Sequence, residues 1–187
     1  KSCSELVTHC YRRSFFESES VAVSTARAGN VIGGGDFAPD RIIPDCIRAT
    51  LSKQTIVVRN PLSTRPYQHV LEPLMAYLII AERQYKNPTL AGSYNIGPDD
   101  RDCVATGDLV RLFCETWGED AHWVARPDNN GPHEANFLKL DCSKAKQTFS
   151  WAPNWNIERA VAETIAWTKA WKAGVPVAET MNQQIDR

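Results

Sequence analysis

The chain has 187 residues and a formal net charge of −1, with 43% hydrophobic and 23% charged residues. These values fit one globular domain, or one lobe of a larger one, that buries its own core. The balanced charge gives no positive field that would favour nucleic acid, and no run of about 18 apolar residues predicts a membrane span.

The opening sequence Lys-Ser-Cys-Ser-Glu-Leu is polar and does not have the pattern of a signal peptide. Six cysteines lie in the chain without a CxxC pair or a zinc-binding spacing, so no metal site is predicted. Several lie in apolar stretches, and a disulfide framework is typical of shorter secreted chains. We therefore expect reduced, buried cysteines in a cytoplasmic protein.

Apolar periodicity and turn residues predict short strands alternating with helices, which indicates the α/β class. In chain order the predicted elements are a helix over 3–16, a strand over 20–28, a glycine-rich loop over 30–36, a helix over 41–53, strands over 55–59 and 67–70, a helix over 71–85, a strand over 93–96, a helix over 107–117 capped by Thr106, strands over 121–125 and 137–140, and helices over 143–149 and 157–171.

The glycine cluster Gly33–Gly35 lacks the GxGxxG spacing of a dinucleotide-binding loop, so no complete Rossmann unit is predicted. Three successive glycines indicate a backbone that lies close to another group. Two hypotheses remain at this point: the group is a pyrophosphate, or the loop is a tight structural turn. The four tryptophans near the end of the chain are predicted to pack in the core, at positions 151, 155, 167 and 171.

Several sequence blocks, in order, resemble the extended short-chain dehydrogenase/reductases that act on nucleotide sugars, the NAD-dependent epimerase/dehydratase family. The blocks are Ala-Arg-Ala-Gly-Asn-Val-Ile-Gly-Gly-Gly-Asp at 26–36, Arg-Ile-Ile-Pro at 41–44, Arg-Asn-Pro at 59–61 with Arg-Pro-Tyr-Gln-His-Val at 65–70, Tyr-Asn-Ile-Gly-Pro at 94–98, and Leu-Asp-Cys-Ser-Lys-Ala-Lys at 140–146 with Trp-Ala-Pro at 151–153. The first and third blocks, with Pro-His-Glu-Ala at 132–135, resemble most the 4,6-dehydratases that act on CDP-glucose.

The resemblance implies that residues 1–187 form the C-terminal, nucleotide-sugar-binding lobe of such an enzyme, with the NAD-binding domain absent. In the family the catalytic pair is Tyr-x-x-x-Lys on one helix, and Lys1 resembles its lysine. The tyrosine would precede Lys1 by one helical turn, on the same face. The family is a lyase in deoxysugar and lipopolysaccharide synthesis, but Lys1 alone is expected to be a remnant or a solvated terminal residue, and no NAD is expected to bind this chain alone.

The resemblance also implies a set of substrate-binding residues: Asn30, Arg41, Arg59, Arg65, His133 and Glu134. Arginine forks suit the two phosphates of a CDP-sugar, and Arg65, placed in a turn beside Pro66, is the predicted phosphate ligand. Each residue has a structural alternative. Arg41 fits a surface ion pair equally well, Asn30 fits a left-handed turn, and Glu134 fits an ordinary loop.

In the family the first helix takes part in an intersubunit bundle. Here it carries an apolar stripe of Leu6, Val7, Cys10 and Phe15, so we expect a homodimer through this helix. Two functional hypotheses follow. The chain is either a nucleotide-sugar-binding lobe that is inactive alone, or a truncated, non-catalytic protein that folds and self-associates without sugar chemistry.

Overall fold

The computed structural model describes residues 1–16, 21–126 and 136–187. Its helices and strands alternate, which confirms the α/β class. The elements are α1 Ser2–Tyr11 with a π-helical turn Arg12–Phe16, β1 Thr25–Ala28, β2 Asn30–Ile32, α2 Ile42–Leu51, β3 Ile56–Val58, β4 Thr64–His69, α3 Leu71–Lys86, a 3₁₀ turn Pro88–Leu90, β5 Ser93–Ile96, a 3₁₀ turn Asp100–Asp102, β6 Cys103–Ala105, α4 Thr106–Trp117, β7 Trp123–Ala125, α5 Ser143–Phe149, α6 Ile157–Lys172 and α7 Val177–Ile185.

The strands of the described residues form three small sheets. Strands β1 and β5 pair in parallel, and so do β3 and β7. The third sheet has the order β2-β4-β6, with β4 parallel to β2 and antiparallel to β6. The chain changes sheets at Gly29, where an added Cβ would lie 2.5 Å from the carbonyl oxygen of Pro66. A residue without a side chain is therefore required where β1 gives way to β2.

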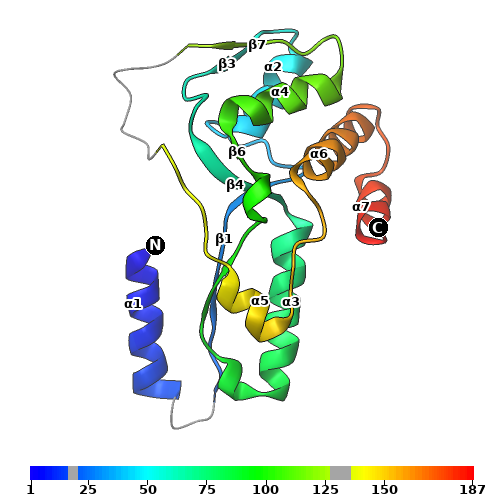
Figure 1. The fold of residues 1–187 in the computed structure, drawn as a ribbon. Helices are drawn as coiled ribbons and strands as arrows, with labels where there is room; N and C mark the ends of the chain where they lie inside the picture. Colours follow the sequence, from blue (N-terminus) through cyan, green and yellow to red (C-terminus); the bar gives the residue numbers. More distant parts are fainter. Residues whose placement is uncertain (17–20, 127–135) are drawn as a thin grey trace.

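Two hydrophobic clusters form the core. The larger one joins α2, α4 and α6 to β3 and includes the fully buried Phe113 and Val161. The smaller one lies between α3, β5 and α5 and includes Ile96 and Trp151. In Figure 1 the first cluster corresponds to the upper part of the molecule, and the second to the lower part, where α3 and α5 lie on the opposite side of β1 from α1.

Two buried carboxylates hold in place the segment that leads into α6. Glu72 on α3 accepts hydrogen bonds from the backbone N–H groups of Asn154 and Trp155, the latter at 2.8 Å. Asp102 accepts from the backbone N–H of Ile157 at 3.0 Å, which satisfies a donor at the first turn of α6. The segment before α6 is thus hydrogen-bonded both to α3 and to the 3₁₀ turn Asp100–Asp102.

Most predicted elements are confirmed, and the differences have local causes. The strand predicted over 137–140 is wrong, because among the described residues only Phe137 forms an isolated bridge, to Thr64. Thr106 does not cap α4: it is the first helical residue, and its hydroxyl donates to the carbonyl oxygen of Ser63 at 3.0 Å. Strand β1 is shorter than predicted, and β2, β6 and α7 were not predicted. Strand β2 takes up the first three residues of the predicted loop over 30–36, because Asn30–Ile32 pair with β4.

The cysteines and tryptophans also differ in part from expectation. All six cysteines are free, but Cys3 and Cys10 are exposed on α1 rather than buried. Trp171 is 42% exposed, whereas the other three tryptophans near the C-terminus are buried as predicted. In the part of the chain that the structure describes, the helices are all too short or too polar to cross a bilayer.

His69 gives the fold a specific acid sensitivity. Burial lowers the pKa of its imidazole to about 4, with Glu163 opposing and Arg159 adding to this effect. The pKa of the unfolded state is about 6.5, so above pH 6.5 the ring is neutral in both states and its protonation costs the fold no stability. The free energy of unfolding should then decrease between pH 6.5 and pH 4, by about 3 kcal/mol at most.

Urea unfolding of His69→Phe at pH 7, 6, 5 and 4 checks this expectation. The variant is expected to be less stable at pH 7, because its ring no longer accepts the hydrogen bond from the N–H of Leu71, but to lose less stability on acidification than the wild type. His122→Gln, which replaces an exposed histidine, serves as the control and should follow the wild type. Parallel pH curves for wild type and His69→Phe would contradict the assignment.

Candidate functional site

A cavity of about 660 Å³ opens where the carboxyl end of β3, the start of α2 and strands β2 and β4 meet. Four of the five predicted site residues that the structure describes line it: Asn30, Arg41, Arg59 and Arg65. They come from four separate segments, so the tertiary fold alone brings them together. The fifth, Lys1, lies exposed at the start of α1 and does not line this cavity. His133 and Glu134 lie outside the described residues.

The lining of the cavity mixes polar and apolar groups. Ile43 from α2 and Ile56 and Val58 from β3 contribute to it, but these side chains are nearly completely buried, so the larger part of the exposed lining is polar. Small-molecule sites combine apolar surface with placed polar groups. Here the polar part, which includes the three arginines, is the larger one.

A cluster of hydroxyl groups forms the deep polar part. The Ser63 and Thr106 hydroxyls are 2.9 Å apart, and the Tyr67 hydroxyl lies 3.3 Å from that of Thr106. All three residues are buried and line the cavity. Tyr67 thus belongs both to the core and to the wall of the site.

Arg65 and Asn30 are positioned by neighbouring strands. Arg65 lies within β4 and not in a turn as predicted, and its Nη1 donates to the carbonyl oxygen of Thr64 at 2.9 Å. Asn30 opens β2 and pairs in register with Tyr67. The left-handed turn considered for Asn30 is wrong, because the positive φ values of non-glycine residues belong to Asp40, Lys53 and Ser150.

Arg41 and Arg59 each pair with an aspartate that was not among the predicted site residues. Arg41 Nη1 donates to Asp36 Oδ2 at 2.8 Å, and Arg59 Nη2 lies 3.5 Å from Asp40 Oδ1. Both aspartates line the cavity. The ion pair considered for Arg41 is therefore present within the candidate site. Burial raises the pKa of Asp36, but the hydrogen bonds from Arg41 and the Ala38 N–H outweigh it and hold the pKa below its usual value.

The triple glycine allows close packing against α6 and does not form a phosphate-binding loop. A Cβ on Gly34 would lie 2.1 Å from the ring of Trp167, and one on Gly33 would lie 2.8 Å from Val70. The group that lies close to this backbone is thus an indole on α6, which supports the structural turn over the pyrophosphate hypothesis. A dinucleotide phosphate does not fit where Trp167 already lies.

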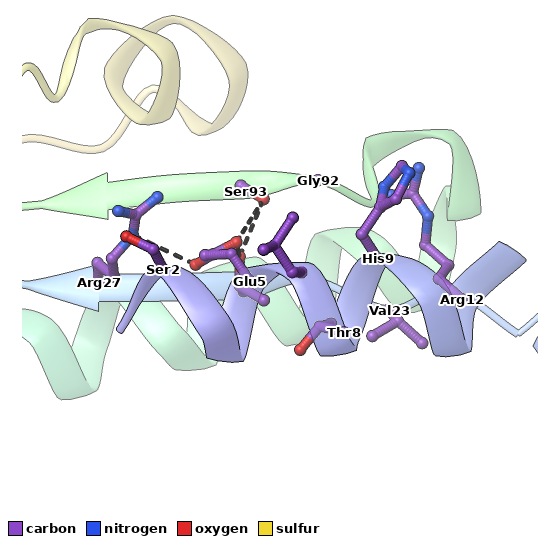
Figure 2. Close-up of a pocket in the computed structure, with 11 residues that line it drawn as sticks. Ser2, Glu5, Thr8, His9, Arg12, Val23, Arg27, Gly92 and Ser93 are labelled. Carbon is purple, nitrogen blue, oxygen red and sulfur yellow. Dashed lines mark hydrogen bonds and ion pairs between the residues drawn. The ribbon is translucent and has the colours of Figure 1, made fainter.

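A second cavity, of about 490 Å³, lies between α1 and strands β1 and β5. Figure 2 shows Glu5 of α1 pointing toward Arg27 and Ser93 on these strands. Its carboxylate pairs with Arg27 at 3.2 Å and accepts hydrogen bonds from the Thr25 and Ser93 hydroxyls at 2.9 and 3.2 Å. None of the five described site residues lines this cavity, and its central charge is already partnered, so it is not the candidate site.

No family model matches the chain. Solved structures nevertheless define the class of the fold. Over 92% of the chain and 52% of the other protein, the structure matches UDP-glucose 4-epimerase with UDP-glucose from Thermotoga maritima, with a TM-score of 0.76 and 20% identity. It also matches dTDP-glucose 4,6-dehydratase with NAD from Bacillus anthracis, over 91% of the chain and 51% of that protein, with a TM-score of 0.71 and 18% identity.

The chain thus has the fold of about half of these nucleotide-sugar epimerases and dehydratases, as the sequence blocks predicted. By sequence, the chain is 43% identical over 180 residues to CDP-glucose 4,6-dehydratase of Salmonella typhimurium strain LT2. The match covers 93% of the chain and 50% of that enzyme. The chain thus spans about half the length of the relatives it matches, and the resemblance predicted from the sequence is confirmed.

The close contact between Gly34 and Trp167 predicts a large effect of one methyl group. Gly34→Ala should lower the free energy of unfolding by roughly 2–3 kcal/mol, because the indole is buried and cannot move aside freely. Gly92→Ala is the matched control, since its methyl group would meet only the flexible end of Lys144 and the Tyr94 ring. Urea unfolding measures both. Equal stability of the two variants would contradict the packing role.

Proposed function

We propose that the chain is the nucleotide-sugar-binding part of a CDP-glucose 4,6-dehydratase, and that it binds the CDP-sugar in the cavity of about 660 Å³. The observation that carries the proposal is the convergence of Asn30, Arg41, Arg59 and Arg65 on this one cavity. Sequence similarity to CDP-glucose 4,6-dehydratase supports the choice of a CDP-sugar. A cytoplasmic location and a role in deoxysugar synthesis for lipopolysaccharide are part of this proposal, the former supported by the six free cysteines.

Three arginines and three aspartates line the cavity, and the arginine guanidiniums are the groups suited to a diphosphate. Arg65 is half-buried on β4, where a guanidinium interacts with an anion more strongly than in bulk water. Arg41 and Arg59 are more exposed and flank the opening from α2 and β3.

NAD enters the proposal through the relatives and not through these residues. The B. anthracis dehydratase binds NAD according to its structure. Here the glycine cluster is covered by Trp167, and no GxGxxG sequence occurs, so the residues do not fit a dinucleotide. We propose that residues 1–187 bind the nucleotide sugar without NAD. No hydride step is assigned to them, and Lys1 is proposed as a remnant of Tyr-x-x-x-Lys.

The surface of α1 supports self-association. Leu6, Val7 and Tyr11 on α1 and Phe15 in the following π-helical turn are each more than half exposed, and the Tyr11 and Phe15 ring centroids lie 5.3 Å apart with tilted planes. Neighbouring exposed apolar side chains of this kind are typical of an interface. We propose that two copies pair through α1.

Calorimetric titration tests the binding proposal. CDP-glucose is expected to bind, and dTDP-glucose and GDP-mannose to bind more weakly. Arg65→Ala should weaken CDP-glucose binding roughly tenfold or more, because a charge-assisted bond to phosphate is lost. Arg111→Ala, an exposed arginine on α4 outside the cavity, should leave binding unchanged. A folded wild type that gives no heat with any of the three ligands would refute the proposal.

Light scattering tests the dimer. The wild type is expected to be dimeric at micromolar concentrations, and Leu6→Glu to shift it toward monomer by placing a charge in the apolar face of α1. Leu62→Glu is the matched control, since Leu62 is 86% exposed and lies outside α1. A monomeric wild type would overturn the pairing.

A further inference from the structure

One loop supplies a carboxylate to each of the two outer arginines of the cavity. The loop over 36–41 connects the glycine turn to α2 and carries both Asp36 and Asp40. Asp36 pairs with Arg41, five residues later in the same segment. Asp40 pairs with Arg59, which follows β3 in another segment of the chain. All four residues line the cavity, so neither arginine faces an incoming ligand without a competing carboxylate.

The two ion pairs differ in strength. The Asp36 side chain is 26% exposed, hydrogen-bonds Arg41 at 2.8 Å and also accepts from the N–H of Ala38 at 3.1 Å. The Asp40 and Arg59 side chains are 83% and 65% exposed and lie 3.5 Å apart, beyond the usual length of a charge-assisted hydrogen bond. An exposed pair of this length holds its partners only weakly. Asp36 is therefore a fixed neighbour, and Asp40 an exchangeable one.

The backbone, and not the ion pair, places Asp40 at the opening. Its φ of +58° lies in the left-handed region, which aspartate and asparagine adopt more readily than other side chains with a Cβ. On one side the loop is anchored by Phe37, whose ring packs on Trp171 at 4.9 Å and whose carbonyl oxygen accepts from Arg48. On the other side it enters α2. The backbone of Asp40 thus stays near Arg59 whether or not the pair is formed.

We propose that Asp40 is an exchangeable counter-ion of Arg59, which neutralises the guanidinium in the empty cavity and is displaced by a phosphate oxygen of the bound nucleotide sugar. This inference rests on the proposed function and adds to it a residue that sets the affinity for phosphate. The released carboxylate returns to water at little cost because it is already exposed. A neutral ligand, such as a nucleoside, leaves the pair intact. Asp40 therefore lowers the affinity of the cavity for phosphate-bearing ligands and leaves that for neutral ligands unchanged.

A double-mutant cycle tests the exchange. CDP-glucose and cytidine are titrated by calorimetry into the wild type, Asp40→Asn, Arg59→Ala and the double variant, each first shown to unfold cooperatively. Asparagine keeps the left-handed backbone and removes only the charge. Asp40→Asn is expected to tighten CDP-glucose binding by about three- to fivefold, and to leave cytidine binding unchanged. In the Arg59→Ala background the gain should disappear. Asp186→Asn, an exposed aspartate after α7, is the matched control and should behave as wild type.

The outcomes separate this inference from the proposed function. Unchanged or weaker CDP-glucose binding by Asp40→Asn, or a gain that persists without Arg59, overturns the counter-ion role while wild-type binding still supports the proposed function. A gain of the same size for cytidine also overturns it, because the effect of Asp40 would then not come from competition with phosphate. A wild type that does not bind CDP-glucose at all refutes both.

Discussion

Strand β4 is the constraint on which the rest of the structure depends, because its residues 66–69 are buried on both faces. It pairs with β2 and β6, and the amide of Gln68 donates to the carbonyl oxygen of Ile96, which links it to the β1–β5 sheet. At its other end the strand leaves Arg65 half-buried at the cavity. A strand buried on both faces fixes the backbone position of Arg65 at the cavity, and a fixed backbone lowers the cost of ordering the site when a ligand binds.

Close backbone packing around β4 explains why glycine recurs in the preceding segment. Gly29 admits the carbonyl oxygen of Pro66, and Gly34 admits the ring of Trp167. The same loop then presents Phe37 to Trp171 and turns through Asp36 and Asp40 into α2. A glycine-rich sequence beside a candidate nucleotide site thus contributes indirectly. It lets α6 support the loop whose carboxylates control the outer arginines.

The sequence predicted the elements with strong local signals and missed those set by tertiary contacts. Strand β5 and helix α5 have the predicted bounds, since turn residues and caps mark their ends. Strand β6 and the strand position of Arg65 depend on mutual pairing in antiparallel register, which periodicity over three residues does not reveal. In the site, the arginines were predicted from resemblance. The contact between Asp40 and Arg59 could not be predicted, because it depends on the left-handed backbone at Asp40, which the residue pattern does not indicate.

The location of the cavity bears on whether half of a dehydratase-like enzyme is able to bind ligand. The cavity is lined by residues between Gly29 and Thr106 and shares none of them with the cavity beneath α1. Three residues of its lining, Ile43, Ile56 and Val58, belong to the larger core cluster, which is built from α2, α4, α6 and β3 within this chain. The exposed apolar side chains of α1 lie at the other part of the molecule (Figure 1). The proposed self-association through α1 would therefore leave the cavity open, so the two proposals can be tested independently of each other.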